Sequence, residues 1–328
     1  MGMRRLLPVV LLSLLLAGCA AETAPDPGRL QVAATVAPIT SIVSAVVGDA
    51  VDVTGLVPEG TNSHAFEPPP SMAKVLSQAD VIFVNGLKLE EPTVALAEKN
   101  KAQQARIVKL GDAVLPAQDY IFDFSFPESG GKPNPHLWTD PGYAKRYAEV
   151  VRDTMVAVDP AAAASYRDNY DRFAADVDAL DAAMRTAFET LPPERRKLVT
   201  YHDAYAYFAR TYGWKVVGAI QVESFEDPTP RQVARLIEQV KAEGVPAIFG
   251  SEVFPSPVLA QIGREAGVAY VDRLRDDDLP GRPGDAEHSW LGLMRFDYLT
   301  IVNSLGGDAS ALAALPVVSV PDRAKYPQ

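Results

Sequence analysis

Histidines are scarce in this chain of 328 residues, and their side chains are among the common ligands of transition metals. There are four of them: His64, His136, His202 and His288. A single histidine is more simply explained as a loop residue. His136, in the stretch "NPHLWTDP", could hydrogen-bond within its loop and pack against Trp138. Where all four lie relative to the strands decides between these interpretations.

Short apolar runs alternate with amphipathic stretches from Leu30 onward, a pattern typical of parallel βα units. We therefore predict the α/β class, with two lobes that each contain a mostly parallel sheet flanked by helices. The expected strands are 30–36, 51–57, 80–86 and 105–111 in the first half, then 197–201, 214–220, 245–254 and a run that begins at 267.

The middle of the chain carries one long apolar stripe at steps of three and four residues, which predicts a helix of about thirty residues. It consists of Tyr166, Tyr170, Phe173, Val177, Leu180, Met184 and Phe188. A coiled coil would extend the stripe further, so we interpret the helix as a strut that joins two lobes. The expected organisation is a signal peptide (1–18), a tether (19–29), an N-terminal lobe (30–158), a linking helix (159–191) and a C-terminal lobe (192–328).

Three of the histidines and one carboxylate lie after expected strands. His202 directly follows strand 197–201, and Asp272 directly follows the apolar run 268–271. His64 and His136 lie in the loops after strands 51–57 and 105–111. Open α/β sheets bind ligands beyond the carboxyl ends of their strands. Imidazoles with a carboxylate suit zinc and related divalent ions, so we predict a metal site there, with Glu252 as a reserve for the fourth ligand.

The N-terminus has the layout of a secretory signal: two arginines, an apolar run, and small residues before Cys19. The ending "LAGC" resembles the lipobox of bacterial lipoproteins, in which the cysteine carries the lipid. We therefore expect Cys19 to be lipidated and to anchor the protein to a membrane outside the cytoplasm, in the periplasm or on the outer cell surface.

Composition excludes several other classes. The net charge of −11 argues against nucleic acid as a partner. Cys19 is the single cysteine, so neither a disulfide framework nor a thiolate metal site can form after it is lipidated.

Five stretches together resemble one known family, over about residues 31–310 and in the same order throughout. They are "NSHAFEPPPSMAKVLSQADVIFVNGLKLE", "NPHLWTDP", "LVTYHDAYAYFARTYGW", "EDPTPRQVARLIEQVKAEGVPAIFGSEVF" and "YVDRL". The family is that of the zinc- and manganese-binding lipoproteins of bacterial ABC importers, solute-binding proteins with a rigid helical backbone. The resemblance implies two α/β lobes joined by one long helix, no catalysis, and delivery of the metal to an ABC permease, presumed here to be by a monomer.

The same resemblance implies a ligand set of His64, His136, His202 and Asp272. Many zinc importers of the family have a histidine-rich loop between the first two ligands, whereas residues 113–135 contain no histidine. Manganese-selective members often have glutamate at the third ligand, where this chain has His202. That difference favours Zn(II) as the transported ligand, with Mn(II) as the alternative.

Other polar residues have simpler explanations. Asp140 is expected to be a helix N-cap. Glu67, three residues past His64, either orients that histidine, steers cations, or is a solvated carboxylate. The run Asp276–Asp278 and His288 are expected in a solvated Pro/Gly-rich loop.

Two other functions compete with a metal carrier. A zinc hydrolase needs three protein ligands and an open position for water, and the sequence contains no HExxH helix. A surface adhesin would need no buried ligand set at all. The predicted four-ligand site therefore favours capture and delivery of an ion.

Overall fold

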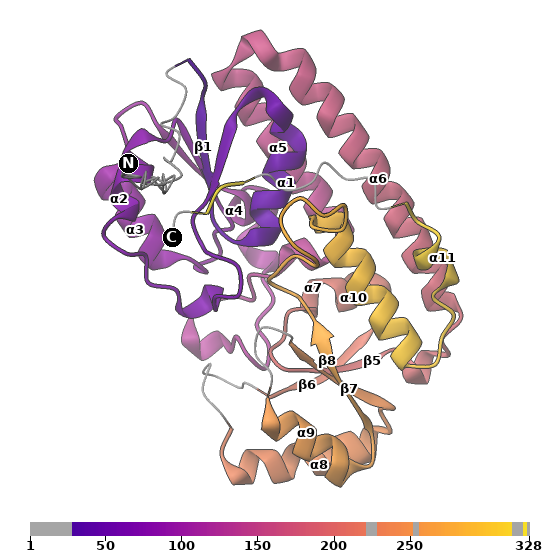
Figure 1. Cartoon of the computed structure of the whole chain (residues 1–328). Coiled ribbons are helices and arrows are strands. Elements are labelled where there is room, and N and C mark those ends of the chain that lie inside the picture. Colours follow the sequence, from indigo (N-terminus) through magenta and orange to yellow (C-terminus); the bar gives the residue numbers. More distant parts are fainter. Residues whose placement is uncertain (1–27, 221–227, 252–255, 317–323, 327–328) are drawn as a thin grey trace, which may run out of the picture.

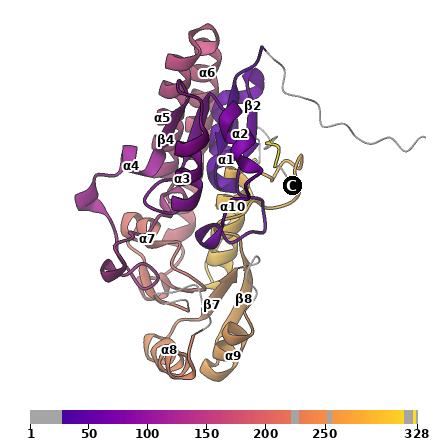
Figure 2. The same ribbon diagram turned by 90° about the vertical axis from the view of Figure 1, so that its left-hand side faces the viewer.

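The computed structural model describes residues 28–220, 228–251, 256–316 and 324–326. It contains two lobes, each built on a sheet of four parallel strands, and a long helix that runs beside both (Figure 1). The predicted fold class is confirmed. Figure 2 shows the first lobe above the second, with α8 (Pro230–Glu243) and α9 (Pro257–Ala266) at the far end of the second.

The first sheet has the strand order β2-β1-β3-β4, and all neighbouring strands are parallel. Its strands are β1 (Gln31–Ala34), β2 (Asp52–Gly55), β3 (Val81–Val84) and β4 (Arg106–Lys109). Its helices are α1 (Ala37–Val47), α2 (Met72–Gln78), α3 (Glu91–Asn100) and α4 (Leu110–Val114). Each β3 residue is buried, as expected for a central strand covered by helices on both faces.

The second sheet repeats this topology with the order β6-β5-β7-β8. Its strands are β5 (Lys197–Thr200), β6 (Lys215–Ala219), β7 (Ala247–Ser251) and β8 (Ala269–Leu274), and α7 (Ala206–Tyr212) follows β5. Helix α8 begins with a capping box, in which Thr229 and Gln232 satisfy each other's backbone N–H groups. Gly213 ends α7 in the left-handed conformation.

Two helices at the centre connect the lobes. Helix α5 (Pro141–Val158) begins at Asp140, whose carboxylate accepts the backbone N–H of Gly142 at 2.7 Å, so the predicted N-cap is confirmed. Helix α6 (Ala163–Glu189) has 27 residues, about 40 Å at 1.5 Å per residue. Six of the seven predicted stripe residues are buried, and Tyr170 is half-buried. Packing of this stripe against α1 and α5 makes α6 a rigid strut.

The end of the described chain returns to the first lobe. Helix α10 (Trp290–Ser304) packs against α6 and β8, and α11 (Ser310–Ala313) follows it. Lys325 then forms a parallel bridge with Thr54 in β2. The last described residues therefore lie on the first sheet rather than with the second lobe, although the sequence suggested one continuous C-terminal lobe from 192 to 328.

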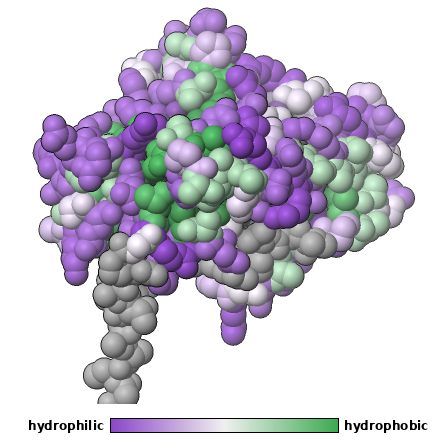
Figure 3. Space-filling view, turned by 90° about the horizontal axis from the view of Figure 1, so that it is seen from above, coloured by the Kyte–Doolittle hydropathy of each residue, from purple (hydrophilic) through white to green (hydrophobic). Residues whose placement is uncertain are grey.

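Hydrophilic residues cover most of the face seen from above the first lobe, with a hydrophobic area near its centre (Figure 3). Within the described ranges, no helix is long and apolar enough to cross a membrane.

Candidate metal-binding site

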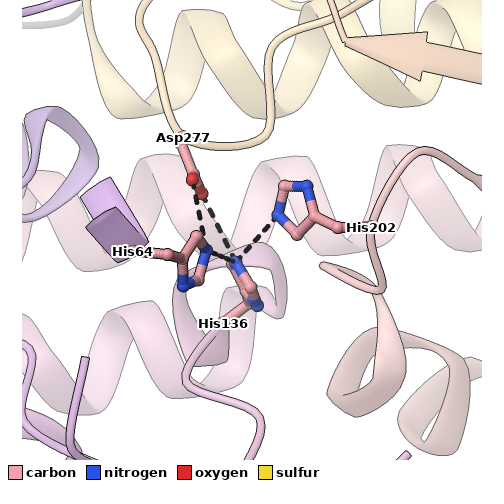
Figure 4. A group of neighbouring side chains, drawn as sticks. All are labelled: His64, His136, His202 and Asp277. Atoms are coloured by element: carbon pink, nitrogen blue, oxygen red, sulfur yellow. Dashed lines mark hydrogen bonds and ion pairs between the residues drawn. The ribbon is translucent and has the colours of Figure 1, made fainter. Parts of the chain in front are cut away.

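Three histidines and one aspartate meet between the two lobes (Figure 4). The residues are His64, His136, His202 and Asp277, and each contributes one potential ligand atom within 4.8 Å of the others. Two come from the first lobe and two from the second. The structure thus brings the three predicted histidines together, but with a different carboxylate.

The spacing of the ligand atoms suits a small ion. The Nε2 atom of His136 lies 3.2 Å from Nε2 of His64 and 3.1 Å from Nε2 of His202. The Asp277 carboxylate lies 3.5 Å from Nε2 of both His64 and His136. Ligand atoms of a tetrahedral zinc with bonds of about 2.0 Å are about 3.3 Å apart. Most of these separations are therefore close to the edge of a zinc tetrahedron.

The first-lobe ligands sit on short helical turns that their own loops fix. His64 lies in a 3₁₀ turn (Ser63–Ala65) after β2, and its backbone N–H donates to the Asn62 side chain at 3.0 Å. His136 precedes the turn Leu137–Thr139, directly before α5. Oδ1 of Asn134 accepts the backbone N–H of His136 and lies 2.9 Å from its Nδ1. A proton on Nδ1 would leave Nε2 of His136 free to bind a cation.

The second-lobe ligands follow two strands of the second sheet. His202 comes two residues after the end of β5, as expected. Asp272 does not follow its strand, because β8 continues to Leu274. Asp272 therefore lies within β8, where it is exposed and does not belong to the cluster. The carboxylate that reaches the site is Asp277, in the turn beyond the true end of β8.

The prediction of a solvated loop at Asp276–Asp278 was therefore wrong. Asp276 and Asp277 are 5% and 7% exposed. His288 is also fully buried, but its Nε2 lies 2.9 Å from the Glu59 carboxylate, outside the cluster. Glu67 is exposed and lies outside the cluster as well. Two other predicted residues, Cys19 and Glu252, fall outside the described ranges.

Neighbouring side chains close the site from several directions. The ring of Trp138 lies 4.9 Å from that of His136, and its Nε1–H donates to the Asp276 carbonyl at 2.8 Å. Phe126 covers the opposite side, 5.5 Å from the rings of His64 and His136. A cavity of about 250 Å³ adjoins the cluster at His64 and is lined in part by Phe126. An ion therefore has a route of approach on the His64 side.

Burial sets the charge of the cluster. It lowers the pKa of the His136 imidazole to about 4, although Asp277 opposes the shift, and it holds the pKa of His202 well below the usual value. Burial would raise the pKa of Asp277, but interactions with His136 and His64 outweigh it and hold that pKa well below normal. Near neutral pH, the cluster thus presents unprotonated nitrogens on His136 and His202 beside an ionised carboxylate, which is the state that binds a metal.

Comparison with known proteins agrees with this geometry. The sequence model of the ZnuA family, described as the periplasmic component A of the zinc-uptake complex, matches residues 32–304. The fold and the matching relatives define the class: metal-binding substrate-binding proteins of ABC transporters, which are not enzymes. The chain belongs to the ZnuA family.

Relatives in this class are named for different metals. The manganese-binding lipoprotein MntA of Halalkalibacterium halodurans is 30% identical, over 90% of this chain and 96% of its own. The iron-binding protein YfeA of Yersinia pestis is 28% identical, over 85% and 87%. The structure of the periplasmic zinc-binding protein TroA of Treponema pallidum superposes with a TM-score of 0.76, at 25% identity, over 85% of this chain and 99% of that one. The relatives share a metal-import role and differ in the metal named.

The low pKa of His136 makes the stability of the metal-free protein depend on pH. Between pH 6.5 and about 4 the unfolded chain binds a proton at this residue and the folded chain does not, so stability should decrease as the pH falls through this window. The full shift corresponds to about 3 kcal/mol. Denaturant unfolding in the presence of a chelator, at several pH values, measures the slope.

His136→Gln is the control for this dependence, because glutamine has no titrating proton. Its slope over the same window should be shallower by about one proton, while His202 keeps part of the dependence. Identical slopes in the two proteins would mean that His136 is not held neutral by burial.

Proposed function

We propose that this protein captures Zn(II) outside the cytoplasmic membrane and delivers it to the permease of an ABC importer. The observation that carries the proposal is the convergence of three imidazole nitrogens and one carboxylate from both lobes. Such a set can close around an ion and leaves no position for a substrate or an activated water, as expected for a carrier and not for a hydrolase.

The proposed ligands are His64, His136, His202 and Asp277. Asp277 takes the role that we first gave to Asp272, because it is buried among the imidazoles whereas Asp272 is exposed on β8. Glu67 is too exposed to orient His64 from a fixed position, so we propose at most a weak steering effect on cations.

Ligand chemistry supports zinc over manganese. Three nitrogens and one carboxylate suit a tetrahedral zinc ion, and the shortest separations between ligand atoms fit that geometry. Manganese prefers more oxygen ligands and lies at the weak end of the divalent affinity series. Manganese remains the second candidate because MntA, at 30% identity, is named for manganese.

We further propose that the protein acts as a monomer anchored by lipid on Cys19, with 1–18 as signal and 19–29 as tether. One chain supplies all four ligands, so no partner copy is needed for binding. Several relatives are named as lipoproteins of metal ABC transporters, which supports an anchor and a permease partner.

The ligand set predicts a sharp contrast between two aspartates. His64→Ala, His136→Ala, His202→Ala and Asp277→Asn should each weaken zinc binding by at least about tenfold, since even the loss of residues that only support ligands costs that much. Asp272→Asn is the matched control and should leave the affinity unchanged. Competition against a chelator of known zinc affinity measures each constant. Equal effects of the two aspartate substitutions would refute the proposed fourth ligand.

The choice of metal depends on His202. The unaltered protein should hold zinc more tightly than manganese in a buffered competition, and His202→Glu should narrow this preference by replacing a nitrogen with harder oxygen ligands. Tighter binding of manganese by the unaltered protein would refute the choice of zinc, and the import role would stand.

The anchor depends on one residue. Cys19→Ser should move the protein from the membrane fraction to the soluble extracytoplasmic fraction, because it removes the site of lipidation. Fractionation followed by immunoblotting measures the distribution, and unchanged zinc binding serves as the control for folding. A membrane pool of undiminished size would contradict the lipoprotein prediction.

A further inference from the structure

The turn that carries Asp277 has an unfavourable backbone. Asp276 has a φ of 29°, in the left-handed region that residues with a side chain rarely adopt. This turn directs two consecutive carboxylates to different places. Asp277 faces His64 and His136, while Asp276 lies 3.5 Å from Nδ1 of His202. Surrounding contacts must hold such a conformation in place.

The side chain that holds this turn belongs to helix α10. Oδ1 of Asp297 accepts the backbone N–H of Arg275 at 3.0 Å, and Oδ2 accepts the backbone N–H of Asp276 at 3.2 Å. Asp297 is 3% exposed. Burying a carboxylate inside a helix packed on α6 and β8 is costly unless hydrogen bonds compensate, and here they bind the residues that precede Asp277.

The same carboxylate also reaches the segment that carries another ligand. The hydroxyl of Tyr205 donates to Oδ2 of Asp297 at 2.9 Å, and Tyr205 is three residues after His202. Tyr205 is itself buried, with 1% of its surface exposed. One side chain on α10 therefore connects the two segments through which the second lobe presents its metal ligands.

We propose that Asp297, together with Tyr205, is a positioning residue for the metal site: it fixes the turn 275–277 so that Asp277 points at the ion. This inference rests on the proposed function, since it assumes Asp277 as a ligand. Asp297 touches no metal in this account. It acts through the backbone of Arg275 and Asp276, and it ties the turn to a helix that packs along the strut α6.

Trp138 supports the same turn from the first lobe. Its Nε1–H donates to the carbonyl oxygen of Asp276 at 2.8 Å, so the peptide units on both sides of the Asp276 Cα are hydrogen-bonded to buried groups. Ser63 Oγ donates to Oδ2 of Asp277 at 3.0 Å. With the turn and the carboxylate both fixed, Asp277 needs little rearrangement on binding, and such preorganisation raises affinity.

Tyr205→Phe and Asp297→Asn test the inference, with Tyr166→Phe as the matched control. The Tyr166 hydroxyl donates to the Asp159 carboxylate at 2.8 Å, a contact of the same kind at the junction of α5 and α6. Tyr205→Phe should weaken zinc binding by about tenfold and speed zinc release into a chelator, as the loss of a supporting contact does. Tyr166→Phe should change neither.

Cobalt supplies a readout that a merely structural role would not move. The visible absorption spectrum of Co(II) bound in place of zinc reports coordination geometry, so it should change in Tyr205→Phe and Asp297→Asn and stay the same in Tyr166→Phe. Spectra and affinities that match the unaltered protein in Tyr205→Phe would overturn the inference, and Tyr205→Phe decides it even if Asp297→Asn fails to fold.

Asp277→Asn separates this inference from the proposed function. If Asp277→Asn weakens zinc binding and Tyr205→Phe does not, the positioning role is refuted and the ligand set stands. If Asp277→Asn has no effect on zinc or cobalt binding, the ligand set fails, and the positioning role fails with it.

Discussion

Three imidazole nitrogens and a carboxylate oxygen must come within about 3 to 5 Å of each other without a proton among the nitrogens. In water the imidazoles would take up protons as the pH fell below about 6.5. Burial prevents this for His136 and His202, because a charged imidazole is unfavourable in a site that water does not solvate. The rest of the fold serves to enclose these groups and to keep them together.

Neither lobe can enclose the site alone. Each sheet presents its loops at one edge, and each edge supplies two of the four side chains. The two edges must face each other at a fixed distance, so the long helix α6 is a requirement of the site rather than an ornament of the fold (Figure 1). Its buried stripe packs on α1 and α5 of the first lobe, and α10 connects it with the second. A rigid strut of this kind limits the relative motion of the lobes, so changes on binding are expected mainly in the loops.

The alternation of strands and helices, the long stripe and the helix caps could be predicted because each is a local pattern in the sequence. Helix α10 could not, because it is buried on most of its surface and so lacks the amphipathic period that marks a helix. The histidines could be predicted because their chemistry narrows the choice to four residues. Carboxylates are common, and nothing local distinguishes Asp277 from its acidic neighbours.

The error at Asp272 has a specific physical cause. Strand β8 lies at the edge of its sheet, where exposed polar residues are tolerated, so Asp272 and Arg273 interrupt the apolar run without ending the strand. Three consecutive aspartates then resemble a solvated loop. What buries two of them is not local: the imidazoles of both lobes, Trp138 of the first lobe and the buried carboxylate of Asp297 on α10. The fourth ligand of this site is thus defined by contacts between segments that are far apart in the sequence, and only the folded structure brings them together.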